Sequence, residues 1–391
     1  EHKRVPFISY PYEWTFSQLK IAALHHLEFQ IFLLENNAIL RDASAYNIQF
    51  IGTKPVFIDL PSLALYQEGE YWQGYKQFCE QFLYPLLLNT KTGVSHNKIY
   101  RSEIEGISAD TLAKLLPTSK KLSLNILLHL TLQNYAARKA ITHEKQIAIK
   151  IRDQKPLPKN RYKALLKQLH AWITSLSLKE RQSLSLWENY ASNNSYSEEE
   201  TSLKHEIVND FVARTQPNLL IDLGCNNGSY TRTALIAGAK YAVGYEFDHE
   251  ATTLAYEAAK TEGLDFLPLR IDVSNPSPSQ GWWQSERLGL KERSRADGVL
   301  ALAFVHHLAI ARNIPLDQVI DWITDIAPTG LIEFVPKSDP MVQKMLSVRE
   351  DIFQNYDINT FEKILESRFK IITKKHVTST GRMIIEYSNI V

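Results

Sequence analysis

The feature that most constrains the fold is a regular alternation in the C-terminal half, where short apolar runs are separated by segments with helical patterns. The runs are nearly continuous in apolar side chains, which is typical of parallel strands covered by helices on both faces. There are five: Leu219–Leu223, Tyr241–Glu246, Phe266–Ile271, Gly298–Phe304 and Leu331–Val335. Two later runs, Lys370–Val377 and Met383–Ser388, flank a turn and predict an antiparallel hairpin. We therefore expect a doubly wound, seven-stranded, Rossmann-like α/β domain that closes with this hairpin.

Length and one polar segment divide the chain. Its 391 residues exceed what one hydrophobic core usually serves, so two domains are expected. The run Ala191–Ser195 has the composition of a linker, and Ser197 with Glu200 forms a capping-box pattern that opens a helix. These signals predict a mostly helical domain over residues 1–185, a linker over 186–195 and the α/β domain over 196–391.

Charge and cysteine content exclude several classes of protein. The chain has 44 Lys and Arg against 43 Asp and Glu, so it carries no global field toward nucleic acid or anionic membranes. The segment 138–167 is locally basic, but it lacks aromatic residues at base-stacking spacing, which favours the solvated face of helices over a nucleic-acid patch. The two cysteines, Cys79 and Cys225, form no C-x-x-C pair, so we expect neither a disulfide framework nor a thiolate metal site.

No apolar run approaches the roughly 18 residues of a membrane span, and no signal-type apolar core follows the first residues. We therefore expect a cytoplasmic protein with no membrane partner.

A glycine turn follows the first predicted strand of the α/β domain and precedes a helix. Glycine at Gly224 and Gly228 lets the backbone approach a ligand that a Cβ would exclude, while the next helix presents unpaired N–H groups. Glu246 ends the second strand, where a carboxylate can accept two ribose hydroxyls, and Phe247 can lie against a base. Asp272 ends the third strand, where it can accept from an adenine amino group. The pattern predicts a site for a nucleoside-bearing cofactor.

These motifs, in this order and with the closing hairpin, resemble the class I S-adenosylmethionine-dependent methyltransferases over about residues 196–391. The resemblance implies a sheet order of 3-2-1-4-5-7-6 and S-adenosyl-L-methionine as cofactor. It assigns cofactor contacts to Asp222, Gly224, Cys225, Asn226, Gly228, Glu246, Phe247, Asp272 and Val273. The segments 275–278, 281–282, 303–308 and 333–337 are similar to bacterial methyltransferases of the host-specific nodulation protein type.

In this fold the residues after the fourth strand face the transferred methyl group. Here they include His306 and His307, and either imidazole could take a proton from an acceptor. The alternative is a polar strand end with one packed and one solvated histidine. No Asn-Pro-Pro-aromatic motif follows this strand, which disfavours planar-amide acceptors, and Cys225 lies in the cofactor turn rather than in an acceptor site. We expect a small molecule or sugar as acceptor ahead of a protein, and RNA last.

The connection over residues 273–296 is long and carries Trp282 and Trp283, so it forms either a substrate lid or a cover for the core. Further candidates for the pocket wall complete the predicted site: Tyr196, Tyr230, Glu333 and Asp339.

The N-terminal half begins with a helical pattern over residues 15–37 and a hairpin pattern over residues 47–58. Asp42, Asn47 and Asp59 then match the catalytic loop and metal-binding aspartate of kinases, in which the first orients the acceptor and the other two hold magnesium. Only 41 residues precede Asp42, and no glycine-rich loop is present. This half is therefore a kinase-like remnant or an unrelated helical module.

Three functions remain open from these observations. A methyltransferase is the principal prediction. The alternatives are a kinase-like phosphotransferase or pseudokinase with an accessory α/β domain, and a non-enzymatic scaffold that keeps both folds.

Overall fold

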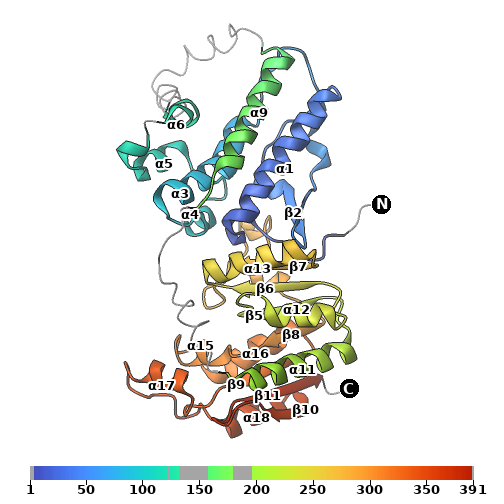
Figure 1. The fold of residues 1–391 in the computed structure, drawn as a ribbon, viewed down its shortest axis with the longest axis vertical. Coiled ribbons are helices and arrows are strands. Elements are labelled where there is room, and N and C mark those ends of the chain that lie inside the picture. The colour runs from blue at the N-terminus through green and yellow to red at the C-terminus, as the bar shows by residue number, and fades with distance from the viewer. Residues whose placement is uncertain (1–3, 122, 132–156, 179–195, 390–391) are drawn as a thin grey trace. The chain divides into compact units, whose positions relative to one another are not determined.

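The computed structural model describes residues 4–121, 123–131, 157–178 and 196–389 (Figure 1). The chain forms two compact units. Unit 1 contains the described residues 4–8, 51–54 and 196–389, and unit 2 contains those within 9–50 and 55–178. The predicted linker over 186–195 lies outside the described residues.

Unit 1 is built on a seven-stranded sheet in the order β10-β11-β9-β8-β5-β6-β7. Its strands are β5 (Leu220–Leu223), β6 (Ala242–Glu246), β7 (Phe266–Arg270), β8 (Gly298–Ala301), β9 (Thr329–Phe334), β10 (Phe369–His376) and β11 (Met383–Asn389). The first five pair in parallel, and β11 pairs antiparallel with both β9 and β10. Counted along the domain, this order is 3-2-1-4-5-7-6, so the predicted topology is confirmed.

Helices connect these strands, as the alternating pattern predicts. They are α11 (Glu198–Thr215), α12 (Ser229–Ile236), α13 (His249–Glu262), α14 (Leu290–Arg293), α15 (Val305–Ala309), α16 (Leu316–Ile326), α17 (Pro340–Leu346), α18 (Ile358–Glu366) and the 3-10 helix η7 (Trp282–Gln284). The capping box at the start of α11 is formed, because Ser197 and Glu200 exchange backbone-to-side-chain hydrogen bonds of 2.8 and 3.1 Å. Every residue of β5 and β6 is buried, as expected for central parallel strands.

The fourth strand is shorter than predicted. The apolar run predicts a strand from Gly298 to Phe304, but β8 ends at Ala301. The chain then turns, because Ala303 adopts φ 49°, a left-handed conformation that cannot continue a strand. The helix α15 begins two residues later.

Unit 2 is mostly helical, and it contains the two-stranded sheet β1–β4 and most of the sheet β2–β3, whose residues 51–54 belong to unit 1. Its helices are α1 (Phe16–Glu35), α2 (Tyr75–Phe78), α3 (Tyr84–Thr92), α4 (His96–Ser102), α5 (Ala109–Leu115), α6 (Leu124–Ile126) and α9 (Lys159–Ser175). The strands are β1 (Ala38–Leu40), β2 (Ile48–Ile51), β3 (Lys54–Phe57) and β4 (Leu63–Leu65). Short 3-10 helices are η1 (Pro11–Glu13), η2 (Ala45–Asn47), η3 (Leu60–Ser62) and η5 (Thr118–Lys120), and the π-helical segments are η4 (Cys79–Leu83) and η6 (Leu127–Thr131).

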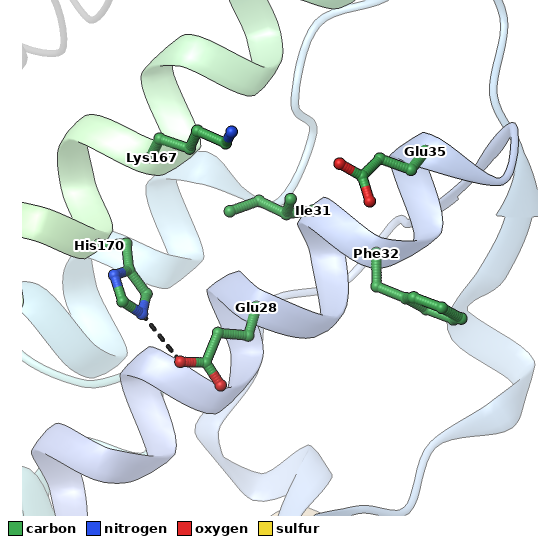
Figure 2. A pocket seen from close by; sticks show the side chains of 6 residues that line it. All are labelled: Glu28, Ile31, Phe32, Glu35, Lys167 and His170. Carbon is green, nitrogen blue, oxygen red and sulfur yellow. Dashed lines mark hydrogen bonds and ion pairs between the residues drawn. The ribbon is translucent and has the colours of Figure 1, made fainter.

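The helix α1 and the hairpin β2–β3 match the patterns predicted for residues 15–37 and 47–58. Thr15 caps α1 through reciprocal bonds with Gln18. The helix α9 runs antiparallel to α1, since Lys163 pairs with Glu35 at one end and His170 pairs with Glu28 further along. Figure 2 shows the second of these pairs. None of the described helices is both long and apolar enough to cross a lipid bilayer.

Candidate cofactor site

The turn between β5 and α12 is built from left-handed residues. Gly224, Asn226 and Gly228 have φ values of 71°, 51° and 81°. Asn tolerates this conformation better than most residues, so the turn forms without a third glycine. Gly224 is exposed, which leaves its backbone open to a ligand. A Cβ at Gly228 would lie 2.7 Å from Cε1 of Phe266, so the second glycine is required by packing.

Two predicted contacts of this turn point away from solvent. Asp222 is buried and accepts a 2.5 Å hydrogen bond from the hydroxyl of Thr231, which ties β5 to the first turns of α12. Burial raises the pKa of Asp222 to about 6. Cys225 is also buried, with its sulfur close enough to Gly244 that a Cβ there would lie 2.5 Å away. Burial raises the pKa of the Cys225 thiol well above its usual value, so this thiol is a poor nucleophile.

Glu246 links the second strand to the glycine turn. Its Oε2 accepts from the backbone N–H of Asn226 at 3.0 Å, and its Oε1 accepts from the N–H of Asp248 at 2.8 Å. The side chain is only 5% exposed, and burial raises its pKa to about 7 despite the two hydrogen bonds. The predicted ribose acid and the predicted glycine turn are therefore in direct contact.

The end of β7 carries Asp272, which is exposed. Its Oδ1 accepts from the backbone and the hydroxyl of Ser274 at 3.0 and 2.6 Å, and its Oδ2 lies 3.6 Å from a guanidinium nitrogen of Arg312. Phe247 is 46% exposed and Val273 is half-buried. Since β5, β6 and β7 are adjacent parallel strands, their carboxyl ends bring these residues to one edge of the sheet.

Sequence reasoning missed Arg312. It follows α15 and hence β8, whereas its partner Asp272 follows β7, and β5 and β6 lie between those two strands. The local sequence around neither residue indicates this ion pair, because the two connections are separated by two strands of the sheet.

The two candidate catalytic histidines lie in α15, with ring centroids 4.2 Å apart. His306 is 2% exposed, and its Nδ1 has no hydrogen-bond partner among the described residues. Burial lowers its pKa well below the usual value. His307 is less buried, and burial together with the charge of Arg382 lowers its pKa to about 4. Both imidazoles are therefore neutral at pH 7 and can accept a hydrogen bond.

Three of the four candidates for the pocket wall, Tyr196, Glu333 and Asp339, belong to one largely buried polar cluster. Glu333 ion-pairs with Lys204 at 2.8 Å and accepts from the hydroxyl of Tyr196 at 2.7 Å. Arg382 contacts that hydroxyl and binds Asp339 through two hydrogen bonds of 2.7 and 3.0 Å. We call these five residues the buried cluster.

Two members of the buried cluster were not predicted. The burial of Lys204 could have been recognised from the sequence, because Lys204 lies on the same helical face as Ile207 and Val208, where an apolar residue is expected. No such indication exists for Arg382, because an arginine in a hairpin turn is usually exposed. Tyr230 remains half-buried, with the ammonium of Lys204 4.9 Å from its ring centroid.

The long connection after β7 covers part of the core, and its role as a substrate lid stays a prediction. Leu290 and Arg293 of α14 are buried, so part of it covers the core. Trp282 and Trp283 are 79% and 86% exposed, and Trp283 has φ 57°. The tryptophan tip therefore stands in solvent.

Unit 2 brings together two of the kinase-like candidates. Asn47 donates a 2.9 Å hydrogen bond to Asp59, while Asp42 is exposed. Within the described ranges no three His, Cys, Asp or Glu side chains are placed to hold a metal ion. The kinase-like origin of this half stays a prediction.

A shallow hollow of about 400 Å³ also lies in unit 2, between α1 and α9 (Figure 2). Lys167 and Glu35 point into it from opposite sides, and Phe32 flanks it. None of its lining residues belongs to the candidate cofactor site.

The sheet order, with a glycine turn after β5 and acidic residues at the ends of β6 and β7, is that of the class I S-adenosylmethionine-dependent methyltransferase fold, and unit 1 has this fold. No protein-family model matches the chain. The chain is 42% identical to nodulation protein NoeA of Rhizobium meliloti (strain 1021) over 389 residues. The matched region covers 99% of this chain and 81% of NoeA. The chain therefore belongs to the NoeA family of nodulation proteins.

Many solved structures resemble part of the chain, including two methyltransferases from named bacteria. Magnesium protoporphyrin IX methyltransferase ChlM from Synechocystis PCC 6803, with bound SAM, is 15% identical with a TM-score of 0.35, over 49% of this chain and 80% of its own. N-methyltransferase NodS from Bradyrhizobium japonicum WM9 is 9% identical with a TM-score of 0.38, over 49% and 98%. The fold assignment rests on the sheet order rather than on these likenesses.

Proposed function

We propose that this protein transfers a methyl group from S-adenosyl-L-methionine to a small-molecule or sugar acceptor. The observation that carries the proposal is the contact between Glu246 and the N–H of Asn226, because it joins the predicted ribose acid to the predicted cofactor turn. The exposed residues Gly224, Phe247 and Asp272 supply a backbone, an aromatic face and a carboxylate at the same sheet edge. This donor and acceptor set fits a nucleoside.

In this proposal each residue has a defined role toward the nucleoside. The turn from Gly224 to Gly228 presents its backbone, Glu246 accepts from the ribose hydroxyls, and Asp272 accepts from the adenine amino group. Phe247 and Val273 flank the base. Asp222 and Cys225 act indirectly, because both are buried and support the shape of the turn.

The bound cofactor supplies an electrophilic methyl group on a positively charged sulfur. The chain contributes by aligning the acceptor and excluding water, which can account for much of the rate enhancement in such a displacement. His307 is the better candidate for accepting a proton, because it is less buried than His306. Its lowered pKa keeps the imidazole neutral at pH 7, and a neutral imidazole has one unprotonated nitrogen, the type of atom that can accept from an acceptor O–H or N–H.

The proposed acceptor class is supported by a sequence motif that does not follow β8 and by the name of the relative. No amide-methylating motif follows β8, which favours a hydroxyl or amine acceptor. The relative is named as a nodulation protein, and we extend that association to this chain as part of the proposal.

Calorimetric titration with S-adenosylhomocysteine tests the cofactor site. We expect binding by the wild type and a loss of roughly ten- to a hundredfold in Glu246→Gln, since hydrogen bonds to a charged group contribute about 1.5–3 kcal/mol. Glu257→Gln, an exposed change on the helix that follows the same strand, serves as the control and should bind like the wild type. A wild type that binds neither S-adenosylmethionine nor S-adenosylhomocysteine contradicts the proposal.

Transfer of a labelled methyl group into fractionated cell extract tests the acceptor class. We expect label in a small-molecule or saccharide fraction. Label confined to protein or RNA would overturn the acceptor assignment while leaving methyl transfer intact. With the acceptor in hand, His306→Gln and His307→Gln then test the histidines, and unchanged turnover in the double variant removes their catalytic role.

A further inference from the structure

The buried cluster holds an ion pair that stability alone does not explain. Lys204 on α11 and Glu333 on β9 are 1% and 0% exposed, and their charged atoms are 2.8 Å apart. The desolvation of two such charges commonly cancels their attraction, so an apolar pair of similar volume would often serve the core as well. A charged carboxylate at this position therefore calls for a role that an apolar side chain cannot fill.

Glu333 reaches the turn that follows β8. The N–H of Ala303 donates to Oε2 of Glu333 at 2.8 Å. Ala303 is the residue with φ 49°, a conformation that side chains with a Cβ adopt only when their surroundings hold them there. The carboxylate thus satisfies the backbone at the strained residue itself.

The turn held in this way faces the candidate cofactor site. Phe304 follows Ala303, and a Cβ on Gly224 would lie 3.0 Å from Cδ2 of its ring, so the ring packs on the first glycine of the cofactor turn. The helix α15 begins at the next residue and carries His306 and His307. A change of φ at Ala303 would move Phe304 relative to Gly224 and would redirect α15.

The orientation of Glu333 is itself fixed on several sides. Oε1 accepts from the hydroxyl of Tyr196 at 2.7 Å, and Lys204 donates both to Oε2 and to the oxygen of Tyr196, the latter at 3.1 Å. Arg382 also contacts that oxygen while its guanidinium is held by Asp339. Both carboxylate oxygens therefore accept hydrogen bonds, and these bonds fix the orientation of the Glu333 side chain.

We propose that Glu333 is a positioning residue of the cofactor site, which holds Ala303 in its left-handed conformation and thereby sets Phe304 against Gly224. Lys204 and Tyr196 fix the carboxylate for this task. The inference rests on the proposed function only in that the positioned turn borders the proposed cofactor site. It assigns the buried cluster to the shape of the site rather than to contact with the acceptor.

Two double variants separate positioning from simple packing. Lys204→Met/Glu333→Gln removes both charges but keeps a carbonyl oxygen that can accept from Ala303. Lys204→Met/Glu333→Met removes the charges and that acceptor while keeping similar volume. Neither variant leaves an unpaired buried charge, so we expect both to fold with similar melting temperatures.

We expect the Gln variant to bind S-adenosylhomocysteine within threefold of the wild type and the Met variant to bind at least tenfold more weakly. Without any ligand, amide hydrogen exchange over residues 301–307 should be faster in the Met variant than in the Gln variant. Adding Ala303→Gly to the Met variant should restore binding, because glycine adopts positive φ without support.

Equal affinity and equal exchange in the two double variants would show that Glu333 only fills the core, and the proposal would be overturned. If the Met variant does not fold, folding and binding restored by Ala303→Gly support positioning, whereas a triple variant that also fails to fold overturns it. If the wild type binds no S-adenosylhomocysteine, the proposed function fails, but the exchange comparison still decides the role of Glu333.

Discussion

At the scale of single residues, Glu246 joins two properties that are usually opposed. It is almost fully buried, yet it accepts hydrogen bonds from two backbone N–H groups. Burial disfavours the charged carboxylate and the hydrogen bonds favour it, and burial dominates because the pKa rises to about 7. The protein therefore carries a carboxyl group that changes charge near neutral pH inside its candidate cofactor site.

This property predicts a pH dependence of cofactor affinity. Because the ionised carboxylate is the better acceptor for ribose hydroxyls, S-adenosylhomocysteine should bind about tenfold more weakly at pH 6 than at pH 8, given a pKa near 7. Calorimetry over this range checks the prediction. In Glu246→Gln the dependence should flatten, and a wild-type affinity that is constant from pH 6 to pH 8 would contradict it.

The protonation of Glu246 also affects the stability of the fold, but here the protonated form is the favoured one. Its folded pKa of about 7 lies above its unfolded value, so its favourable contribution is present at low pH and is lost as the pH rises through 7. In the proposed role, cofactor binding requires the ionised form of Glu246, which is the less favourable form in the folded protein. A bound ligand that donates to the carboxylate offsets part of this cost.

At the scale of elements, local sequence signals match the helix starts closely. The capping box of α11 forms with the residues that the sequence pattern indicates, and the structure shows a second capping box at the start of α1. Each of these bonds satisfies an N–H group that the helix itself leaves unpaired.

Loss of a cap should therefore destabilise unit 1 measurably. Ser197→Ala removes the hydroxyl that accepts from the N–H of Glu200, and the expected cost is about 1 kcal/mol. Ser202→Ala, an exposed change inside the same helix, is the matched control and should be neutral or slightly stabilising, since alanine is the better helix former. Thermal unfolding of both variants makes the comparison, and equal melting temperatures would contradict the role of the cap.

At the scale of the whole molecule, one feature that couples stability to pH is a buried histidine. His26 in unit 2 packs among the rings of Trp72, Phe78 and Phe82. Neither of its ring nitrogens has a hydrogen-bond partner among the described residues. Burial, with a smaller effect of His25, lowers its pKa to about 3.

We expect His26 to make the folded chain acid-sensitive. Its folded pKa is below the unfolded value of 6.5, so the unfolded chain binds the extra proton and stability falls as the pH drops below 6.5. Between pH 6.5 and 5 this amounts to about 2 kcal/mol, at about 1.4 kcal/mol per pH unit. Thermal unfolding of the wild type and His26→Phe at pH 7.5 and 5 tests this, and the variant should lose less stability on acidification. An identical loss in both proteins would rule out His26 as the cause.

The amino-acid sequence by itself determined the strand pattern, the glycine turn and the acids at the strand ends. These features are readable because they depend on local periodicity, on backbone conformations that favour glycine or asparagine, and on chain position relative to a strand. Sheet order came from the resemblance that those motifs support, and the structure confirms it.

Tertiary structure alone decided the pair of Lys204 with Glu333, the pair of Arg312 with Asp272, and the early end of β8 at Ala303. Lys204 and Glu333 are 129 positions apart, and nothing in either local sequence specifies the other. Ion pairs between residues so far apart in sequence depend on the order of the strands in the sheet and on which charged side chains are buried next to each other. Burial likewise sets the protonation of Glu246 and His307, because desolvation is a property of the folded surroundings rather than of the residue.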